Sequence, residues 1–301
     1  MEENVSVNDN LGMRMKNNYE SISKTRLMRR TPVAIRIDGK AFHTFTKGFE
    51  KPFDMVLIKS MQQTMKYLCE NIQGCVFGYC QSDEITLILV DYQTLTTDAW
   101  FDYEVQKICS ISASMATMAF NKFFAENVDN YCVEKYINTC NLKDVLSCYS
   151  LTELTKEDSV LVAYINAMNK GAMFDARCFN IPKEEVTNLI YWRQLDATRN
   201  SIQMVGQANF SHKELQNKSC NMIQDMLHEQ KGINWNDYPT VCKRGTACIK
   251  KYEEEGHWVV CGELARFVVD KVNSKWILDT EMPILKGEDR KYVDDLVYIG
   301  E

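Results

Sequence analysis

The sequence has 301 residues, of which 45% are hydrophobic and 25% charged, and its formal net charge is −6. This composition is typical of a globular protein with room for one large or two ordinary domains. No run of about 18 apolar residues occurs, so we expect no membrane span. The negative net charge does not point to a nucleic-acid partner, which would show instead as clustered Lys and Arg.

Two basic clusters do occur, one before the first predicted strand and one late in the chain. The first contains Lys24, Arg26, Arg29 and Arg30, and the second contains Lys243, Arg244, Lys250 and Lys251. Each is compatible with an ordinary solvated face as well as with phosphate binding.

The N-terminus and the cysteines indicate the compartment. The first residues, Met1-Glu-Glu-Asn-Val-Ser6, are acidic and polar, which argues against a secretory signal. The 12 cysteines are scattered without CxxC pairs, as expected in a reducing, cytoplasmic compartment. One group has the residue types of a zinc site, namely Cys242, Cys248, His257 and Cys261. Its spacing fits no established pattern, and ordinary packing is the favoured interpretation.

In chain order, hydrophobic periodicity predicts an alternation of strands and helices up to residue 181. The predicted elements are an amphipathic helix over 12–30, a strand over 32–38, a helix over 54–72, a hairpin over 75–90, a helix over about 101–125 and a strand over 172–179. Residues 128–170 give no clear pattern beyond a polar loop or insertion at 151–158. The order β-α-β-β-α-β is that of a ferredoxin-like fold and predicts an α+β class.

For the remainder of the chain, the sequence predicts helices followed by short strands. The predicted elements are helices over 184–207 and 212–228, a strand over 243–249 entered from a basic turn, and strand pieces over 257–261, 265–270 and 275–278. The end from Glu281 is acidic, and we expect it to be peripheral.

Two carboxylates stand at strand ends. Asp38 closes the first strand at an Asp-Gly turn, and Asp83 lies at the tip of the predicted hairpin, next to Glu84. The ferredoxin-like order brings the first strand beside the hairpin, so the two acids are expected to converge. Strand-end carboxylates can hold Mg²⁺, and two ions about 3.5–4 Å apart suit phosphoryl transfer. The alternative is that they are unrelated turn acids.

Six motifs occur in an order that resembles the tRNA-histidine guanylyltransferase family and its guanylyltransferase-like 3′–5′ polymerase relatives. They are Arg36-Ile-Asp-Gly-Lys-Ala-Phe-His43, Lys51-Pro-Phe-Asp54, Tyr79-Cys-Gln-Ser-Asp-Glu84, Phe174-Asp-Ala-Arg177, Tyr191-Trp-Arg-Gln-Leu-Asp196 and Lys243-Arg-Gly-Thr246. The resemblance implies a polymerase-palm-like core that adds nucleotides to the 5′ end of tRNA, with GTP, ATP and other NTPs as substrates. We therefore divide the chain into a basic lead-in (1–31), a palm-like catalytic core (32–181) and a C-terminal helical and β region (182–301).

The resemblance also implies roles for individual residues. Asp38 and Asp83 match the catalytic metal carboxylates for two Mg²⁺ ions, with the Gly39 carbonyl as a further ligand. The nucleotide-binding positions are Lys40, Ala41, Phe42, His43, Lys51, Ser82, Asp83 and Lys107. The tRNA 5′-end or activation positions are Lys243, Arg244 and Asn200, and the supporting positions are Glu84, Trp192 and Arg193. The alternatives left open are that His43 is a packed loop residue, Lys107 a solvated helix lysine and Glu84 a hairpin surface acid.

One departure from the family pattern bears on the substrate. Where members that act on histidine tRNA carry His-Ile-Asn-Asn, this chain has Thr198-Arg199-Asn200-Ser201. The resemblance is therefore closest to the branch in which template-dependent repair of 5′-truncated tRNA is expected. Addition of a single G to histidine tRNA is the alternative, and a palm-fold nucleotide cyclase and a non-catalytic RNA-binding protein remain open. Relatives are tetramers, so a homotetramer is expected.

Overall fold

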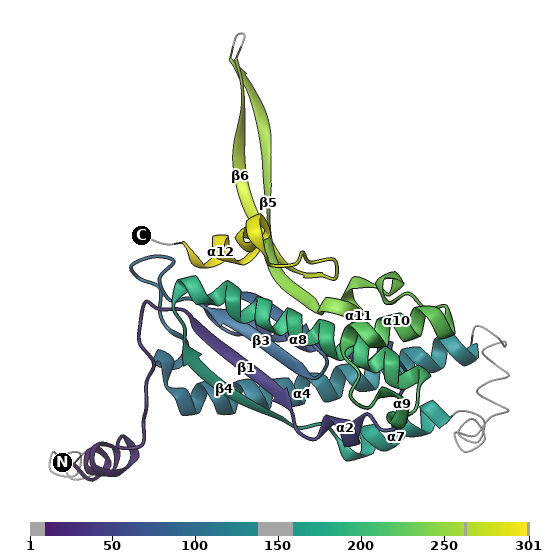
Figure 1. Cartoon of the computed structure of the whole chain (residues 1–301). Coiled ribbons are helices and arrows are strands. Elements are labelled where there is room, and N and C mark those ends of the chain that lie inside the picture. The colour runs from purple at the N-terminus through teal and green to yellow at the C-terminus, as the bar shows by residue number, and fades with distance from the viewer. Residues whose placement is uncertain (1–9, 138–158, 262–263, 300–301) are drawn as a thin grey trace.

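A six-stranded antiparallel sheet forms the centre of the protein. The structure, a computed structural model, describes residues 10–137, 159–261 and 264–299 (Figure 1). The strands are β1 (Val33–Gly39), β2 (Cys75–Gln81), β3 (Glu84–Leu89), β4 (Phe174–Asn180), β5 (Thr246–Cys261) and β6 (Leu264–Asp279). Their order across the sheet is β4-β1-β3-β2-β5-β6, and each neighbouring pair is antiparallel.

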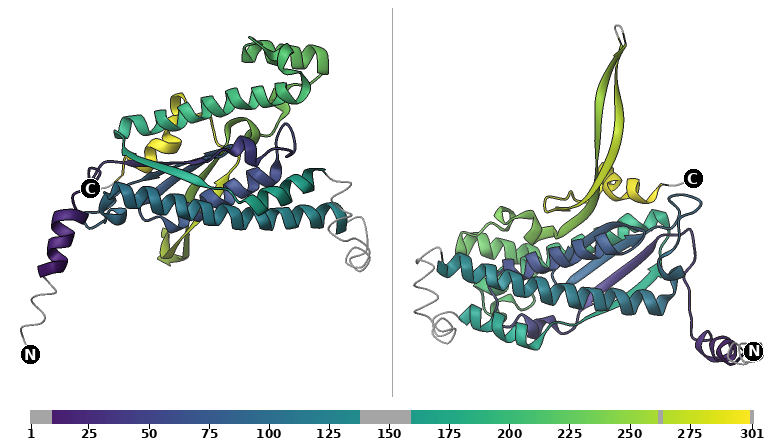
Figure 2. Two further views of the ribbon diagram at one scale, coloured as in Figure 1. Left: turned by 90° about the horizontal axis from the view of Figure 1, so that it is seen from below. Right: turned by 180° about the vertical axis from the view of Figure 1, so that it is seen from behind.

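Helices cover both faces of this sheet (Figure 2). The α-helices are α2 (Phe42–Phe45), α3 (Met55–Asn71), α4 (Val105–Cys132), α7 (Ser159–Lys170), α8 (Lys183–Asn209), α9 (His212–Leu215), α10 (Cys220–Lys231), α11 (Thr240–Arg244) and α12 (Lys291–Val297). Helices α3 and α4 pack on one face, and α8 and α12 pack on the other. The observed order β1-α3-β2-β3-α4-β4 confirms the element order that the sequence predicts up to residue 181.

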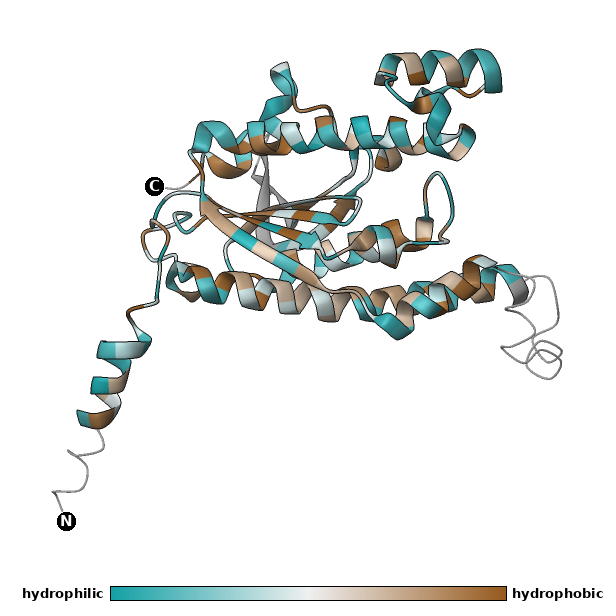
Figure 3. Cartoon of the chain, turned by 60° about the horizontal axis from the view of Figure 1, so that its bottom comes forward, coloured by the Kyte–Doolittle hydropathy of each residue, from teal (hydrophilic) through white to brown (hydrophobic). Residues whose placement is uncertain are grey.

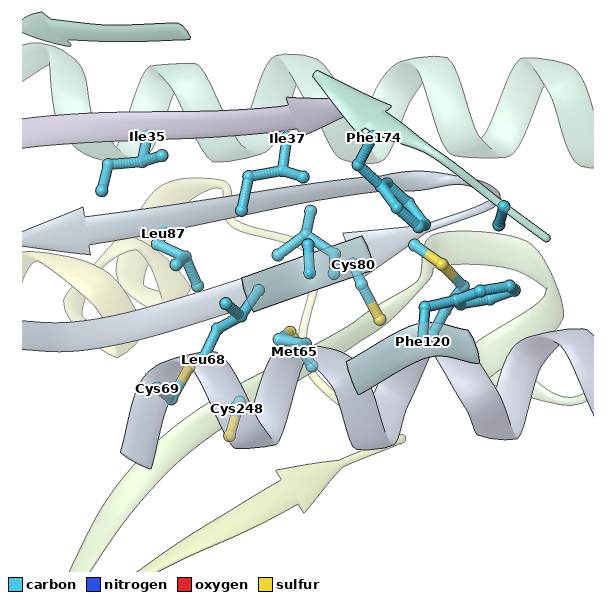
Figure 4. Packing of buried hydrophobic residues seen from close by; sticks show 14 of the residues in the cluster. Ile35, Ile37, Met65, Leu68, Cys69, Cys80, Leu87, Phe120, Phe174 and Cys248 are labelled. Atoms are coloured by element: carbon cyan, nitrogen blue, oxygen red, sulfur yellow. The ribbon is translucent and has the colours of Figure 1, made fainter. Parts of the chain in front are cut away.

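Alternation along the strands separates two cores. In β1, Ile35 and Ile37 point toward α3 and α4, whereas Ala34 belongs to the cluster under α8 and α12. Figure 4 shows the first core, where Ile35, Ile37 and Leu87 of the sheet face Met65 and Leu68 of α3 and Phe120 of α4. Full burial of one such side chain contributes about 1.5–3 kcal/mol to the stability of the folded state. The packing of this layer therefore fixes the strands on which the site residues stand.

An aromatic cluster anchors the loop that follows β1. Phe42 and Phe45 of α2 pack against Phe120 and Phe174 with ring centroids 5.0–5.8 Å apart. Gly39 lets this happen, because a Cβ there would lie 2.2 Å from the Phe42 ring. The chain just after Asp38 is therefore held by packing rather than left as a free loop.

Three predicted helices have different bounds in the structure. The N-terminal helix runs from Asn10 only to Glu20 and stands away from the body (Figure 1), because by Leu27 the chain is extended and its N–H donates to the Tyr103 carbonyl. The helix expected over 101–125 begins later, at Val105, and extends to Cys132. The helix expected over 212–228 is two helices, α9 and α10, since Ser219 caps the second.

The C-terminal predictions are partly wrong. The short strands expected from residue 243 onward are two long strands, β5 and β6, which form a ribbon that projects from the body (Figure 1). The end is not peripheral, because Met282, Leu285, Val293 and Val297 are fully buried. These residues recur along α12 and the segment before it, and they close the core under α8. The three-segment division stays a prediction, and β5 of the third segment pairs with β2 of the second.

No helix in the described ranges is long and apolar enough to cross a bilayer. Hydrophilic and hydrophobic residues alternate along α8 (Figure 3).

Gly245 provides a first test of how the third segment joins the core. It has φ +82°, and a Cβ there would lie 2.5 Å from the Cys80 carbonyl oxygen and 2.8 Å from the Tyr79 hydroxyl. We expect Gly245→Ala to lower the free energy of unfolding, measured by urea denaturation, by about 3 kcal/mol or more. The matched control is Gly232→Ala, which has φ +66° but no atom within 4 Å of its Cβ. It should cost only about 1–2 kcal/mol, and equal losses would contradict the steric account.

Candidate active site

Asp38 and Asp83 meet at one end of the sheet. Asp38 is the penultimate residue of β1 and stands opposite Glu84 of β3 in the antiparallel register. Ser82 and Asp83 form the two-residue turn between β2 and β3, with Ser82 at φ +51°. The Gly39 N–H donates to the Asp83 carbonyl oxygen over 3.1 Å. The hairpin and the juxtaposition of the two acids therefore occur as the sequence predicts.

The electrostatics of the pair favour a cation. Burial raises the pKa of the Asp83 carboxyl, the Ser82 hydroxyl that donates to it over 3.0 Å opposes this rise, and the charges of Asp38 and Glu84 add to it. The Asp38 carboxylate is 45% exposed and has the Arg177 guanidinium at 3.8 Å. Two carboxylates that repel each other in a partly buried place gain most from a positive ion between them.

The residues present fit a hard divalent ion better than zinc. In the described parts of the chain no group of three or more His, Cys, Asp or Glu side chains could hold a metal. An ion at Asp38 and Asp83 would take its other oxygen ligands from the backbone, water or a substrate, which is how Mg²⁺ is usually held. Of the possible zinc ligands, Cys248 is packed in the core and Cys242 is half-buried. The side chains of His257 and Cys261 lie outside the described residues.

A cavity of about 480 Å³ opens beside the two acids. It brings together most of the predicted nucleotide-binding residues: Ala41, Phe42, His43, Lys51, Ser82 and Asp83. Asp54 shapes its wall, because this buried carboxylate caps α3 through the Leu57 N–H and also accepts bonds from the Glu50 N–H and the Tyr164 hydroxyl. These bonds fix the turn that carries Lys51. The volume suits a nucleotide-sized ligand.

Two predicted nucleotide-binding residues do not line this cavity. Lys40 is exposed next to it, and its N–H donates to the Met173 carbonyl. Lys107 lies near the start of α4, where it pairs with Glu104 at 3.8 Å. Ten residues further along α4, Thr117 accepts the Phe174 N–H beside the end of β1. That interval corresponds to about 15 Å of helix, so Lys107 lies well away from the two acids in this structure.

The basic pair Lys243 and Arg244 ends α11. The Thr198 hydroxyl of α8 donates to the Lys243 carbonyl over 3.2 Å, and the Tyr79 hydroxyl donates to the Arg244 carbonyl over 2.6 Å. Because Thr246 pairs with Cys80, the pair sits at the same end of the sheet as the Ser82–Asp83 turn. Arg244 is half-buried with its Nε unpaired among the described groups, while Lys243 bonds the Asn236 carbonyl.

A buried ionic network joins α8 to the sheet. Glu84 is only 8% exposed, so it is not a surface acid. Its two carboxylate oxygens accept bonds from Arg36 at 2.7 Å and from Arg193 at 2.8 Å. Arg193 also bonds Asp196 at 2.8 Å, and Asp196 lies 3.4 Å from the amide of Asn200. Sequence reasoning missed Arg36 and Asp196 as members, although both belong to the quoted motifs.

A family model and a solved structure match large parts of this chain. The family model of tRNAHis guanylyltransferase matches residues 12–182. A bacterial tRNA(His) guanylyltransferase-like protein solved in complex with ATP is 38% identical, with a TM-score of 0.70 over 96% of this chain and 100% of that chain.

Two curated relatives are more distant in sequence. The tRNA(His) guanylyltransferase of Saccharomyces cerevisiae is 25% identical over 73% of this chain and 83% of its own. An uncharacterized protein of Acanthamoeba polyphaga mimivirus is 28% identical over 81% of this chain and 78% of its own. With the family model covering more than half of the chain, and the motif carboxylates meeting beside a nucleotide-sized cavity, the protein belongs to the tRNAHis guanylyltransferase family of nucleotidyltransferases.

Proposed function

We propose that this protein is a metal-dependent 3′–5′ nucleotidyltransferase that adds nucleotides to the 5′ end of tRNA. The observation that carries the proposal is the convergence of Asp38 and Asp83 beside the cavity that holds His43, Lys51 and Ser82. Two carboxylates and a nucleotide-sized cavity are what phosphoryl transfer requires, since its catalysis is mainly positioning and charge neutralisation. The strand order β4-β1-β3-β2 supports a palm-like, ferredoxin-like core.

Asp38, Asp83 and the Gly39 carbonyl would hold the metal, which we propose to be two Mg²⁺ ions. Bound there, the ions would neutralise triphosphate charge and favour ionisation of the attacking hydroxyl. Lys51 would bind phosphate as a cation. A second structure of a bacterial tRNA(His) guanylyltransferase-like protein, in complex with GTP, is 37% identical to this chain, and together the two complexes support ATP and GTP as ligands here.

For the substrate, we propose template-dependent repair of 5′-truncated tRNA, with histidine-tRNA guanylylation as the second candidate. Thr198 stands where the histidine-tRNA enzymes carry histidine, and its hydroxyl is engaged with the Lys243 carbonyl. A site that positions the incoming base mainly by pairing needs no special side chain for an untemplated G. The homotetramer and the cytoplasmic location stay predictions.

The test uses tRNAs that lack their first nucleotide, with the opposing base changed through all four possibilities. We expect the added nucleotide to follow Watson–Crick pairing in each case. Addition of G whatever the opposing base would replace repair by guanylylation as the function.

Lys243 provides a further test of the activation step. If Lys243 contacts the 5′ phosphate, Lys243→Ala should lower kcat/KM on 5′-monophosphorylated tRNA by about tenfold, which is the loss of roughly one charge-assisted hydrogen bond. It should affect 5′-triphosphorylated tRNA less, because that substrate needs no separate activation. Lys251→Ala, in an exposed position of β5, is the matched control. An equal loss on both substrates that varies with salt would indicate general RNA affinity instead.

A further inference from the structure

Trp192 is unusually exposed for a tryptophan beside a reaction centre. Its side chain projects from α8 and is 51% exposed, whereas tryptophans are highly buried on average. The Arg193 guanidinium carbon lies 4.4 Å from the ring centroid, and that of Arg36 lies 5.3 Å from it. These contacts account for part of the ring surface, and the rest is exposed.

Two guanidinium groups contact the ring, one from Arg193 of α8 itself and one from Arg36 of β1. Both are bonded to the same Glu84 carboxylate, one through each oxygen, and Glu84 lies on β3 with its side chain buried. Because one carboxylate holds both guanidinium groups, their contacts with the ring are fixed. About half of Trp192 stays exposed, so we infer that it presents an aromatic surface to solvent.

This surface lies on the far side of the two acids from the nucleotide cavity. Arg36, which contacts the ring, precedes Asp38 by two residues on the same face of β1, a distance of about 7 Å. The cavity begins at Gly39, just beyond Asp38, and is lined by Met204 of α8. Met204 follows Trp192 by twelve residues, which is about 18 Å of helix. The acids thus stand between Trp192 and the cavity.

Nothing among the described residues closes this region at the edge of the sheet. β4 is the edge strand and pairs only with β1. Its side chains that share the face with Arg36 and Asp38 are Arg177 and Asp175, which are 54% and 64% exposed. A duplex end that approached over β4 would meet the ring and the acids together.

We propose that the outward face of Trp192 stacks against the terminal base pair of the RNA whose 5′ end is extended. The proposal rests on the proposed function, since transfer needs two reactants and the nucleotide cavity accommodates only one. A flat aromatic surface accepts any base, because every base has a π-face. Trp192 would therefore position the RNA end without reading its sequence, as repair of many different tRNAs requires.

The test measures RNA binding without nucleotide or divalent ions. One probe is a fluorescent RNA hairpin with a blunt 5′-phosphorylated end, and the other is the same stem closed by loops at both ends, so that no terminal pair is exposed. We expect the protein to bind the blunt hairpin more tightly, and Trp192→Ala to reduce that preference by about 5–150-fold. Trp192→Phe should retain most of it. The matched control is Leu195→Ala, which removes a 52% exposed apolar side chain of the same helix.

Three outcomes would overturn the proposal: no preference for the blunt hairpin in the wild type, a preference that persists in Trp192→Ala, or an equal loss in Leu195→Ala. A steady-state readout separates stacking from a damaged site, because Trp192→Ala should raise KM for RNA and leave KM for ATP and GTP unchanged. The proposed function is tested separately by Asp38. We expect Asp38→Asn to abolish nucleotide addition and to keep the wild-type preference for the blunt hairpin. Full activity of Asp38→Asn would contradict the proposed function without affecting the stacking proposal.

Discussion

Asp38→Asn should reduce nucleotide addition by about 10³-fold or more while the protein remains folded. Loss of one carboxylate would deprive a divalent ion of one of its two acidic ligands, and the stabilisation of transition-state charge supplied there is worth several kcal/mol. The Asp38 side chain is 45% exposed and has only the loose ion pair with Arg177 at 3.8 Å. Removal of this carboxylate should therefore shift the urea midpoint no more than an ordinary surface substitution does. Activity within threefold of the wild type would remove Asp38 from the mechanism.

Asp83→Asn should be equally inactive but not less stable. Burial raises the pKa of Asp83 in the folded protein above that in the unfolded chain. The folded state then binds the proton more tightly, so the ionised carboxylate opposes folding at neutral pH, and this opposition fades as pH falls through the folded-state pKa. Without divalent ions at pH 7, Asp83→Asn should unfold at a urea concentration equal to or higher than that of the wild type. A clearly lower midpoint would show that the carboxylate has a structural role.

Glu84→Gln should cause the largest loss of stability, about 3–5 kcal/mol in the free energy of unfolding. The substitution keeps the volume but leaves Arg36 and Arg193 without their shared counter-charge, and breaking a buried ion pair on one side has a cost of this size. All three side chains are at most 18% exposed. The matched control is Asp175→Asn, a 64% exposed acid paired with Arg177 at 3.1 Å.

The control should cost no more than about 1 kcal/mol, because exposed ion pairs contribute little. Urea denaturation followed by circular dichroism measures both variants. Comparable losses in Glu84→Gln and Asp175→Asn would mean that the buried network is not what joins α8 to the sheet.

The core of the site could be predicted because its signals are local. Asp38 follows a strand with period-2 alternation, and Asp83 lies between two short strand patterns, so element order alone places them together. The cavity residues from Ala41 to Lys51 follow directly in the chain. Family resemblance then supplied their roles, which the residues alone left open.

What was missed depends on contacts between distant segments. Glu84 and Arg193 are 109 positions apart, and no local pattern distinguishes a buried hairpin acid from an exposed one. The charges of the tail from Glu281 predict a peripheral segment. The sequence does not show that Met282 and Val293 pack in the core under α8. The family resemblance assigns Lys107 to triphosphate binding, and this stays a prediction. In this structure Lys107 lies near the start of α4, about 15 Å of helix from the residue that contacts the start of β4.

The most direct measurement of the central claim is to incubate the protein with a 5′-truncated tRNA, Mg²⁺ and α-labelled NTPs, and to locate the label. The account predicts label at the 5′ end of the tRNA, as the nucleotide complementary to the opposing base, with no incorporation in EDTA or with Asp38→Asn. Release of a labelled cyclic nucleotide, or binding of the tRNA without any extension, would contradict it.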